Sequence, residues 1–267
     1  MNEEFSGPRL PEDYFRKKSA ARVWNYWLGG KDNYEVDRKA GDEYAELYPE
    51  IITIAREVRK FLYRCVTYLA GEAGVRQFLD IGTGLPTAQN THEVAQAVAP
   101  DSKIVYVDND PVVLAHARAL LTNTTDEGVT TYIDADVNDP ELIIAEARNV
   151  LNFNEPIAIM LMGILGHAAP TFEQMHSITS RLMAAVPPGS YLVVTDGADT
   201  GDEGYREASE LHKYHLRTLD EFRACFEGLE ILEPGVVPIN TWRPTLVQIG
   251  TPFEPVFGSY ATVGRKP

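Results

Sequence analysis

The sequence predicts an α/β fold with a mostly parallel, doubly wound sheet and an N-terminal helical cap. From about residue 75 onwards, apolar segments of strand length alternate with helical segments, which is typical of parallel βαβ units. Two late strand segments, 229–237 and 257–263, follow each other without a helix between them. Strands joined in this way pair antiparallel, so we expect a hairpin at one edge of the sheet.

The composition limits the partners and the compartment. With 24 basic and 39 acidic residues, the formal net charge is −15, which repels nucleic acids and anionic membranes. Residues 1–18 contain acids and prolines where a secretory signal would be basic and apolar, and the longest nearly apolar run, 157–169, is too short for a membrane helix. The two cysteines, Cys65 and Cys225, indicate neither disulfides nor a metal site. We therefore expect a cytoplasmic protein without a nucleic-acid or membrane partner.

No linker or repeat interrupts the chain, so we expect a mobile segment at 1–18 and a single domain at 19–267. Its first part, 19–74, should form the helical cap, and 75–267 should form the core around the sheet. Helices of the cap are expected at 19–28, 35–47 and 53–71.

Aromatic residues gather around the double glycine of the cap, at 29–30. Two interpretations remain open: the aromatic side chains pack on the core, or Lys31, Asn33 and Tyr34 form a lid over a pocket. A phosphate-binding loop is excluded, because the glycine and hydroxyl positions of that motif hold Asn25 and Asp32. The basic residues of the third helix, Arg56, Arg59, Lys60 and Arg64, are expected to form internal salt bridges.

The segment 75–90 predicts a buried strand, a glycine turn and a helix. Gly82 and Gly84 allow a sharp turn and a close approach to a ligand, and Pro86 suits the first turn of a helix at 86–98. Asp80 stands two residues before the first glycine. The remaining core elements are expected as strands at 103–107, 130–134, 156–162 and 190–195 and helices at 111–121, 140–151, 172–186 and 203–226.

Three carboxylates follow three neighbouring strands. Asp80, Asp108 and Asp136 are separated by 28 residues each time, about one βαβ unit, so they should lie along the same edge of the sheet. A ribose diol and an adenine amine could donate hydrogen bonds to such carboxylates. A dinucleotide fits poorly, because Thr87 stands where a third glycine belongs and Asp80 would repel a diphosphate. A cationic sulfonium nucleoside fits better.

These motifs resemble the class I S-adenosylmethionine-dependent methyltransferases. The match rests on Asp80, Gly82 and Gly84 after the first strand, Asp108 after the second, and Asp136 with Val137 after the third. More narrowly, RVWNYWLGGKDNY, RQFLDIGTGLPT and VYVDNDP resemble an actinobacterial-type S-adenosyl methyltransferase family. The resemblance implies S-adenosyl-L-methionine as cofactor and a Rossmann-like, seven-stranded sheet whose last two strands form the hairpin.

The resemblance also assigns roles to residues. The methionine part of the cofactor would lie on Asp80, Gly82 and Gly84, the ribose on Asp108, and the adenine on Asp136 and Val137. Further contacts are expected from Asn33, Tyr34, Thr83, Thr87, Asn109 and Met162.

The acceptor side is less defined. After the fourth strand, Met162–His167 lacks the Asn or Asp, prolines and aromatic residue with which many amine-methylating members hold a nitrogen, so methylation of nucleic-acid bases is disfavoured. His167 is either a general base or a packing residue. We expect a small-molecule acceptor between the aromatic cap and the segment 199–216, which contains Tyr205, His212, Tyr214 and His215. Alternatives are a regulatory protein that binds the cofactor without transfer, and a nicotinamide-dependent oxidoreductase.

Overall fold

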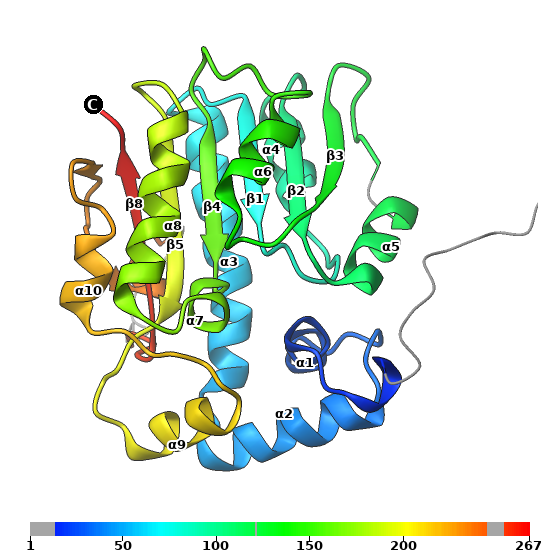
Figure 1. The fold of residues 1–267 in the computed structure, drawn as a ribbon, viewed down its shortest axis with the longest axis vertical. Coiled ribbons are helices and arrows are strands. Elements are labelled where there is room, and N and C mark those ends of the chain that lie inside the picture. The colour runs from blue at the N-terminus through cyan, green and yellow to red at the C-terminus, as the bar shows by residue number, and fades with distance from the viewer. Residues whose placement is uncertain (1–13, 121, 245–253) are drawn as a thin grey trace, which may run out of the picture.

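The centre of the computed structural model, which describes residues 14–120, 122–244 and 254–267, is one mixed sheet. The strand order is β3-β2-β1-β4-β5-β8-β6, with β7 also paired to β8. Figure 1 shows helices on both faces of this sheet and a further helical layer beyond the carboxyl ends of its parallel strands. The predicted α/β class is confirmed.

The parallel part of the sheet places several strand ends at one edge. In the register, Ile81 at the end of β1 lies between Val107 of β2 and Leu161 of β4. After β1 the chain continues to β2 on one side of it, and it later returns to form β4 on the other side. A crevice forms at such a point, where the direction of the strand order reverses. The parallel strands are β1 (Gln77–Ile81), β2 (Lys103–Asp108), β3 (Val129–Asp134), β4 (Ala158–Met162) and β5 (Tyr191–Gly197).

The C-terminal strands form the expected antiparallel edge. β8 (Ser259–Arg265) runs antiparallel to β5 and separates it from the short strands β6 (Glu230–Ile231) and β7 (Val237–Pro238), which both pair with β8. Together β6 and β7 occupy the position of one strand, so the seven-stranded, Rossmann-like arrangement is confirmed. The 3-10 turn η2 (Ile239–Thr241) follows β7, and the rest of the predicted bend, at 245–253, lies outside the described residues.

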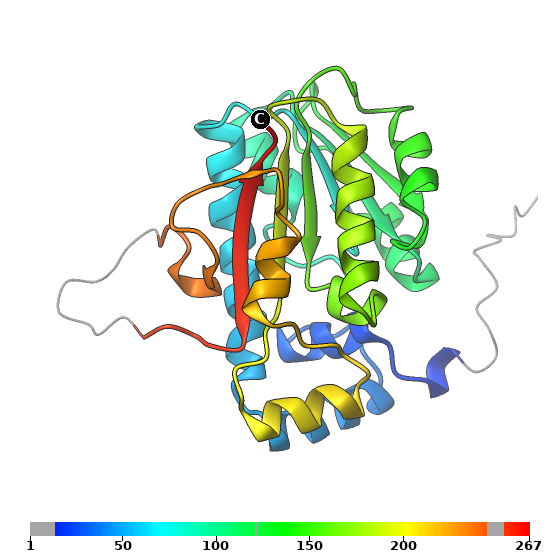
Figure 2. The same ribbon diagram turned by 60° about the vertical axis from the view of Figure 1, so that its left-hand side comes forward.

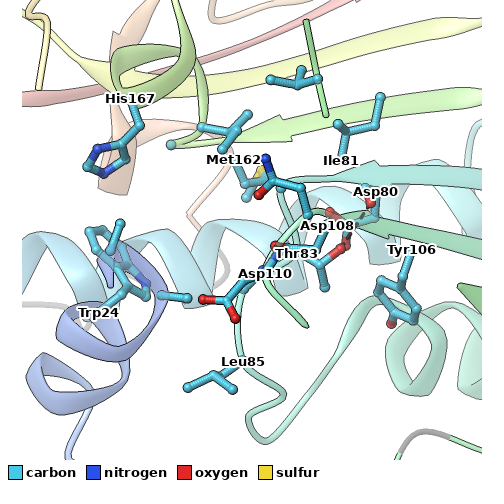
Figure 3. Close-up of a pocket in the computed structure, with 18 of the residues that line it drawn as sticks. Trp24, Asp80, Ile81, Thr83, Leu85, Tyr106, Asp108, Asp110, Met162 and His167 are labelled. Carbon is cyan, nitrogen blue, oxygen red and sulfur yellow. Dashed lines mark hydrogen bonds between the residues drawn. The ribbon is translucent and has the colours of Figure 1, made fainter. Parts of the chain in front are cut away.

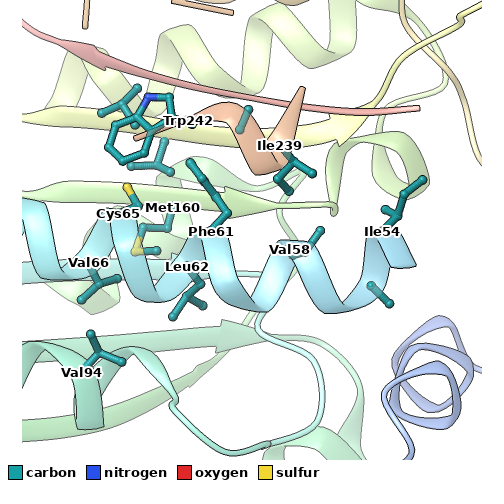
Figure 4. Close-up of a cluster of buried hydrophobic side chains, with 14 of the residues drawn as sticks. Ile54, Val58, Phe61, Leu62, Cys65, Val66, Val94, Met160, Ile239 and Trp242 are labelled. Carbon is teal, nitrogen blue, oxygen red and sulfur yellow. The ribbon is translucent and has the colours of Figure 1, made fainter. Parts of the chain in front are cut away.

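Alternating side chains of the strands build a core on each face of the sheet. Phe78 of β1 packs on the face of α3 (Ile51–Gly71) and α4 (Thr91–Val98). The next residue, Leu79, packs on the opposite face with α6 (Pro140–Ala147) and α8 (Phe172–Ala185). Figure 4 shows the apolar side of α3, from Ile54 to Val66, against Val94, Met160 and Trp242. The other core helices are α5 (Pro111–Leu120) and α10 (Leu219–Ala224).

The layer beyond the strand ends consists of α1 (Ala20–Trp27), α2 (Glu35–Leu47) and α9 (Glu203–Leu211) (Figures 1 and 2). A buried ion pair of 2.8 Å joins Arg22 of α1 to Asp37 of α2. The hydroxyls of Tyr44 in α2 and Ser209 in α9 are 2.9 Å apart. The cap therefore combines the predicted N-terminal helices with α9, from the segment 199–216 that the sequence analysis expected to face the cap across an acceptor pocket.

The structure corrects the helix predictions at three places. The helix expected at 86–98 begins at Thr91, because the Asn90 side chain and Glu93 cap its first turn reciprocally, and Pro86 lies in the preceding loop. The helix expected at 203–226 is two helices, α9 and α10, separated by a segment that runs beside β5. A short helix not expected at all, α7 (Leu165–Ala168), follows β4.

The N-terminal segment is described only in part. Residues 1–13 of the segment expected to be mobile lie outside the described residues, whereas Tyr14–Arg16 form the 3-10 turn η1. Both cysteines are buried and free. Within the described ranges, no helix has the length and apolar character needed to cross a membrane, and no group of histidine, cysteine and acidic side chains could hold a metal ion.

Candidate active site

A cavity of about 480 Å³ lies at the switch point, between the carboxyl ends of β1, β2 and β4 and helix α1. All three predicted carboxylates, Asp80, Asp108 and Asp136, line it. Figure 3 shows Asp80 and Tyr106 at one end and Trp24 and His167 at the other. The parallel register places the carboxylates here, because Asp80 and Asp108 lie at the carboxyl ends of β1 and β2 and Asp136 follows the end of β3.

Asp80 is buried, at 4% exposure, and already has protein partners. The Thr91 hydroxyl donates a hydrogen bond of 2.6 Å to its Oδ2. Burial raises the pKa of Asp80 to about 6, while the bond from Thr91 and the positive charge of Arg59 oppose this rise. The carboxylate is thus partly stabilised within the protein, and a cationic ligand is not its only source of compensation.

The glycine turn leaves space where a side chain would not fit. Gly82 and Gly84 have φ values of 74° and 67°, which side chains rarely allow. A Cβ at Gly82 would lie 2.6 Å from Cβ of Ile164, in the loop after β4. The amide of Gly84 donates a 2.9 Å hydrogen bond to Oδ2 of Asp108, which ties the turn to the end of β2.

Asp108 and Asp110 connect the sheet to the turn and the cap. Oδ1 of Asp108 accepts a 2.9 Å bond from the amide of Asp110, and burial raises the pKa of Asp108. The carboxylate of Asp110 accepts hydrogen bonds from the hydroxyls of Tyr14 (2.7 Å) and Ser19 (2.9 Å). Asp110 also caps α5 through the amide of Val112 and lines the cavity. It therefore fastens the start of α1 over the site.

Asp136 is held by its neighbours at the third strand end. The side chain of Asn109 donates a 3.1 Å bond to Oδ2 of Asp136, and the amide of Asn138 donates a 2.8 Å bond to Oδ1. Val137 is buried and lines the same part of the cavity. The predicted residues Asn109, Asp136 and Val137 are thus brought together.

Thr83, Thr87, Met162 and His167 also line the cavity, but Asn33 and Tyr34 do not. Asn33 donates a 2.9 Å hydrogen bond to the side chain of Asn25, and Asn25 itself lines the cavity. Tyr34 caps α2 and is 40% exposed. The expectation that these two residues touch the cofactor finds no support in this placement, because packing of α1 on α2 turns their loop away from the cavity.

Arg59 is a lining residue that the sequence analysis missed. Its Nη2 donates to the backbone carbonyls of Ala88 (3.1 Å) and Gln89 (2.8 Å), and among the described residues its Nε has no hydrogen-bond partner. The pKa of Arg59 is lowered by burial. Its charge therefore lies at the cavity, near Asp80, instead of in the predicted salt-bridging face. Nothing in the pattern of basic residues on α3 distinguishes Arg59 from its neighbours.

A second cavity, of about 210 Å³, adjoins the first. The two share Trp24, Gly163 and His167, together with Ala20 and Val58. Aromatic residues of the cap and of the segment 199–216 form much of the second cavity, as the sequence analysis expected: Trp24, Trp27, Tyr44, Tyr205 and Tyr214. His212 lines it as well, whereas His215 does not.

His167 lies where the two cavities meet. Its ring makes an edge-to-face contact with Tyr214, with 4.7 Å between the ring centres. Its surface faces the cavities, but the surrounding protein desolvates the ring and lowers its pKa to about 4, and the electrostatic effect of His212, His215 and Lys18 acts in the same direction. His167 is therefore neutral at physiological pH and can accept a proton.

Tyr214 is fixed under His167 by a buried carboxylate. Its hydroxyl donates to Asp196 and accepts from the amide of Gly197 at 2.9 Å. The other oxygen of Asp196 accepts a 2.9 Å bond from the amide of Gly166. A Cβ at Gly166 would lie 2.3 Å from the Tyr214 ring, so the glycine allows the tyrosine to approach the backbone of α7.

Comparisons with known proteins agree with this geometry. The sequence matches the profile of the S-adenosyl methyltransferase family over residues 13–267. No curated protein matches it. The crystal structure of a DUF574 family protein from Streptomyces avermitilis MA-4680 is 38% identical, covers 95% of this chain and 99% of its own, and superimposes with a TM-score of 0.88. A candidate methyltransferase from Thermobifida fusca YX is 41% identical, with coverage of 96% and 97% and a TM-score of 0.88.

A more distant structure shares the fold alone. The plantazolicin methyltransferase BpumL, in complex with a triazolic desmethylPZN analog and S-adenosylhomocysteine, is 14% identical, with coverage of 92% and 96% and a TM-score of 0.51.

The residues of the first cavity fit the cofactor of this family. Carboxylates at successive strand ends suit a cationic nucleoside with hydroxyl and amine donors, and a turn without Cβ atoms allows its close approach. Together with the family profile and the two similar crystal structures, this establishes the class of the protein. The chain belongs to the S-adenosyl methyltransferase family and is an S-adenosylmethionine-dependent methyltransferase.

Proposed function

We propose that this methyltransferase acts on a small molecule bound in the second cavity. The observation that carries the proposal is the junction of the two cavities at Trp24, Gly163 and His167. A cofactor in the first cavity and an acceptor in the second would meet there, and alignment supplies much of the rate in a methyl transfer.

Several residues of the first cavity would hold S-adenosyl-L-methionine. Asp108 accepts backbone hydrogen bonds on both carboxylate oxygens, and a carboxylate has the capacity to accept more than two, which suits a ribose diol. Asp136 and Val137 would hold the adenine. Asp80, Gly82 and Gly84 would hold the methionine part. Nε of Arg59, which has no hydrogen-bond partner in the described part of the chain, is suited to the carboxylate of the cofactor, because guanidinium groups bind carboxylates strongly.

When bound, the cofactor supplies a methyl group on a sulfonium sulfur, which keeps the electron pair of the broken C–S bond and becomes a neutral thioether. The protein has to align the acceptor, exclude water and remove the proton that the acceptor loses. His167 is placed for the last task, because it is neutral and faces both cavities. Trp24 of α1 lines both cavities and would shield the junction from water when the cofactor and the acceptor are bound.

The second cavity favours a small acceptor over a macromolecule. Its walls come from α1, α2, α3, α9, the end of β5 and the loop after β4, and its volume of about 210 Å³ suits a small molecule. The net charge of −15 and the lack of an amine-binding motif after β4 argue against a nucleic-acid acceptor.

A substitution that fills the second cavity tests the proposal. Val23 lines only the second cavity, so Val23→Phe should abolish transfer of labelled methyl groups into the small molecules of a cell extract, which is separated from its macromolecules by ultrafiltration after the reaction, while S-adenosylhomocysteine still binds by calorimetry. The matched control is Val98→Phe, at a valine that is 40% exposed and lines neither cavity. Full transfer by Val23→Phe, or labelling of macromolecules only, would contradict the proposal.

A further inference from the structure

Part of the second cavity is lined by His212 and Lys18, and one buried ring nitrogen of His212, Nε2, has no hydrogen-bond partner among the described residues. Nζ of Lys18 lies 3.2 Å from the other ring nitrogen, Nδ1. A buried polar atom without a partner costs folding free energy unless a ligand satisfies it.

The contact with Lys18 determines what His212 can offer a ligand. An ammonium group only donates hydrogen bonds, so Nδ1 of His212 must accept. In a neutral imidazole the proton then lies on Nε2, which becomes a donor. Burial and the charge of Lys18 lower the pKa of His212 to about 4, which keeps the ring neutral. This part of the cavity therefore offers an N–H donor beside a cationic ammonium group.

Other groups of the second cavity determine how a ligand is oriented in it. Asp196 also lines it, but both of its oxygens already accept bonds from Tyr214, Gly197 and Gly166. An anionic ligand group would be repelled there and attracted to Lys18. Burial lowers the pKa of Lys18, and the charge of Glu43 in α2 opposes this shift. Glu43 is exposed and does not line the cavity.

A second unsatisfied atom lies near the junction with the first cavity. Oγ1 of Thr195, in β5, is buried and has no partner among the described residues. Thr195 pairs in register with Met162, and its carbonyl accepts a 2.7 Å bond from the amide of Gly163. It thus lies beside the loop that carries His167, where the reacting group of an acceptor would be.

Resting on the proposed function, we infer that the acceptor is an aromatic carboxylic acid with a hydroxyl group. Its ring packs between the aromatic walls, its carboxylate binds Lys18 and Nε2–H of His212, and its hydroxyl faces Thr195 and His167. In the reaction the hydroxyl oxygen gains the methyl group, its proton passes to His167, and the cofactor sulfur keeps the electron pair of the C–S bond. The product is an aromatic ether and neutral S-adenosylhomocysteine.

Calorimetry with two isosteric probes tests this inference. The full-length protein, saturated with S-adenosylhomocysteine, is titrated with 4-hydroxybenzoate and with 4-hydroxybenzamide, which differ in charge but hardly in shape. The carboxylate should bind at least tenfold more tightly than the amide. Lys18→Gln and His212→Phe should each reduce this preference to threefold or less. The phenylalanine preserves the edge-to-face contact with Tyr44, in which the ring centres are 5.0 Å apart.

Lys213→Gln is the matched control, because it removes the same charge next to His212 from a residue that lines neither cavity, and it should keep the preference. Equal binding of the two probes, or binding of neither, overturns the inference. Val23→Phe separates this result from a failure of the proposed function. If the wild type binds both probes equally and Val23→Phe binds neither, the second cavity is the acceptor site and only the carboxylate assignment fails. If Val23→Phe binds the probes as the wild type does, the second cavity is not the acceptor site.

Discussion

Replacing Asp108 by asparagine tests how the end of β2 serves both the fold and the cofactor. The change keeps the shape but removes the charge and turns one acceptor oxygen into an NH2 donor. The two oxygens of Asp108 accept the amides of Gly84 and Asp110, each at 2.9 Å. One of these amides must then lose its acceptor and face another donor.

The size of both effects follows from this geometry. A buried donor left without an acceptor costs about 1–3 kcal/mol, so we expect the free energy of unfolding to fall by that amount. Hydrogen bonds to a charged group are worth about 1.5–3 kcal/mol, so losing the carboxylate towards the ribose should weaken S-adenosylhomocysteine binding by about 10- to 150-fold.

Urea denaturation measures the first effect, and calorimetry at a temperature where the variant remains folded measures the second. Asp134→Asn is the matched control. Asp134 pairs with Asp108 in the register of β2 and β3 and ends its own strand, but it is exposed and does not line the cavity. If Asp108→Asn loses stability but binds S-adenosylhomocysteine within twofold of the wild type, Asp108 only holds the turn and its assignment to the ribose is wrong.

Three other predictions follow from the same site. Gly82→Ala places a Cβ 2.6 Å from Ile164 at a φ of 74°, so unfolding in urea should show a loss of about 1–3 kcal/mol, whereas an unchanged midpoint would mean that the loop after β4 moves freely. His167→Gln should lower kcat at least about 100-fold while the Kd of S-adenosylhomocysteine stays within twofold, and a kcat near that of the wild type would exclude the general base. The pKa of His167 falls from an ordinary value of 6.5 to about 4 on folding, so its contribution to stability is present above pH 6.5 and is lost as the pH falls towards 4. Asp80 and Asp196 have pKa values raised from 3.8 to about 6, so they change the stability in the opposite direction over nearly the same pH range. The check is therefore the difference in stability between the wild type and His167→Gln. The variant should lose less stability than the wild type between pH 6.5 and 4, and parallel stability curves would refute the shift.

The sequence by itself determined the sheet and the line of carboxylates. Alternating strands and helices fix a parallel sheet, and in such a sheet equal spacing along the chain becomes adjacency at one edge. Asp80, Asp108 and Asp136 therefore line one cavity, as expected. The helix start at Pro86 was wrong because a reciprocal cap between Asn90 and Glu93 competes with the preference of proline for a first turn.

Only the tertiary structure decided what surrounds that edge. Arg59 reaches the cavity because of how α3 packs across the sheet, and Asn33 and Tyr34 do not because α1 packs on α2. The second cavity depends on α1 and α2 meeting α9, more than 150 residues away in the chain, through contacts such as that of Tyr44 with Ser209. Short-range periodicity sets which face of a helix is apolar, but it does not set which distant surface that face meets, and the acceptor site lies at such a meeting.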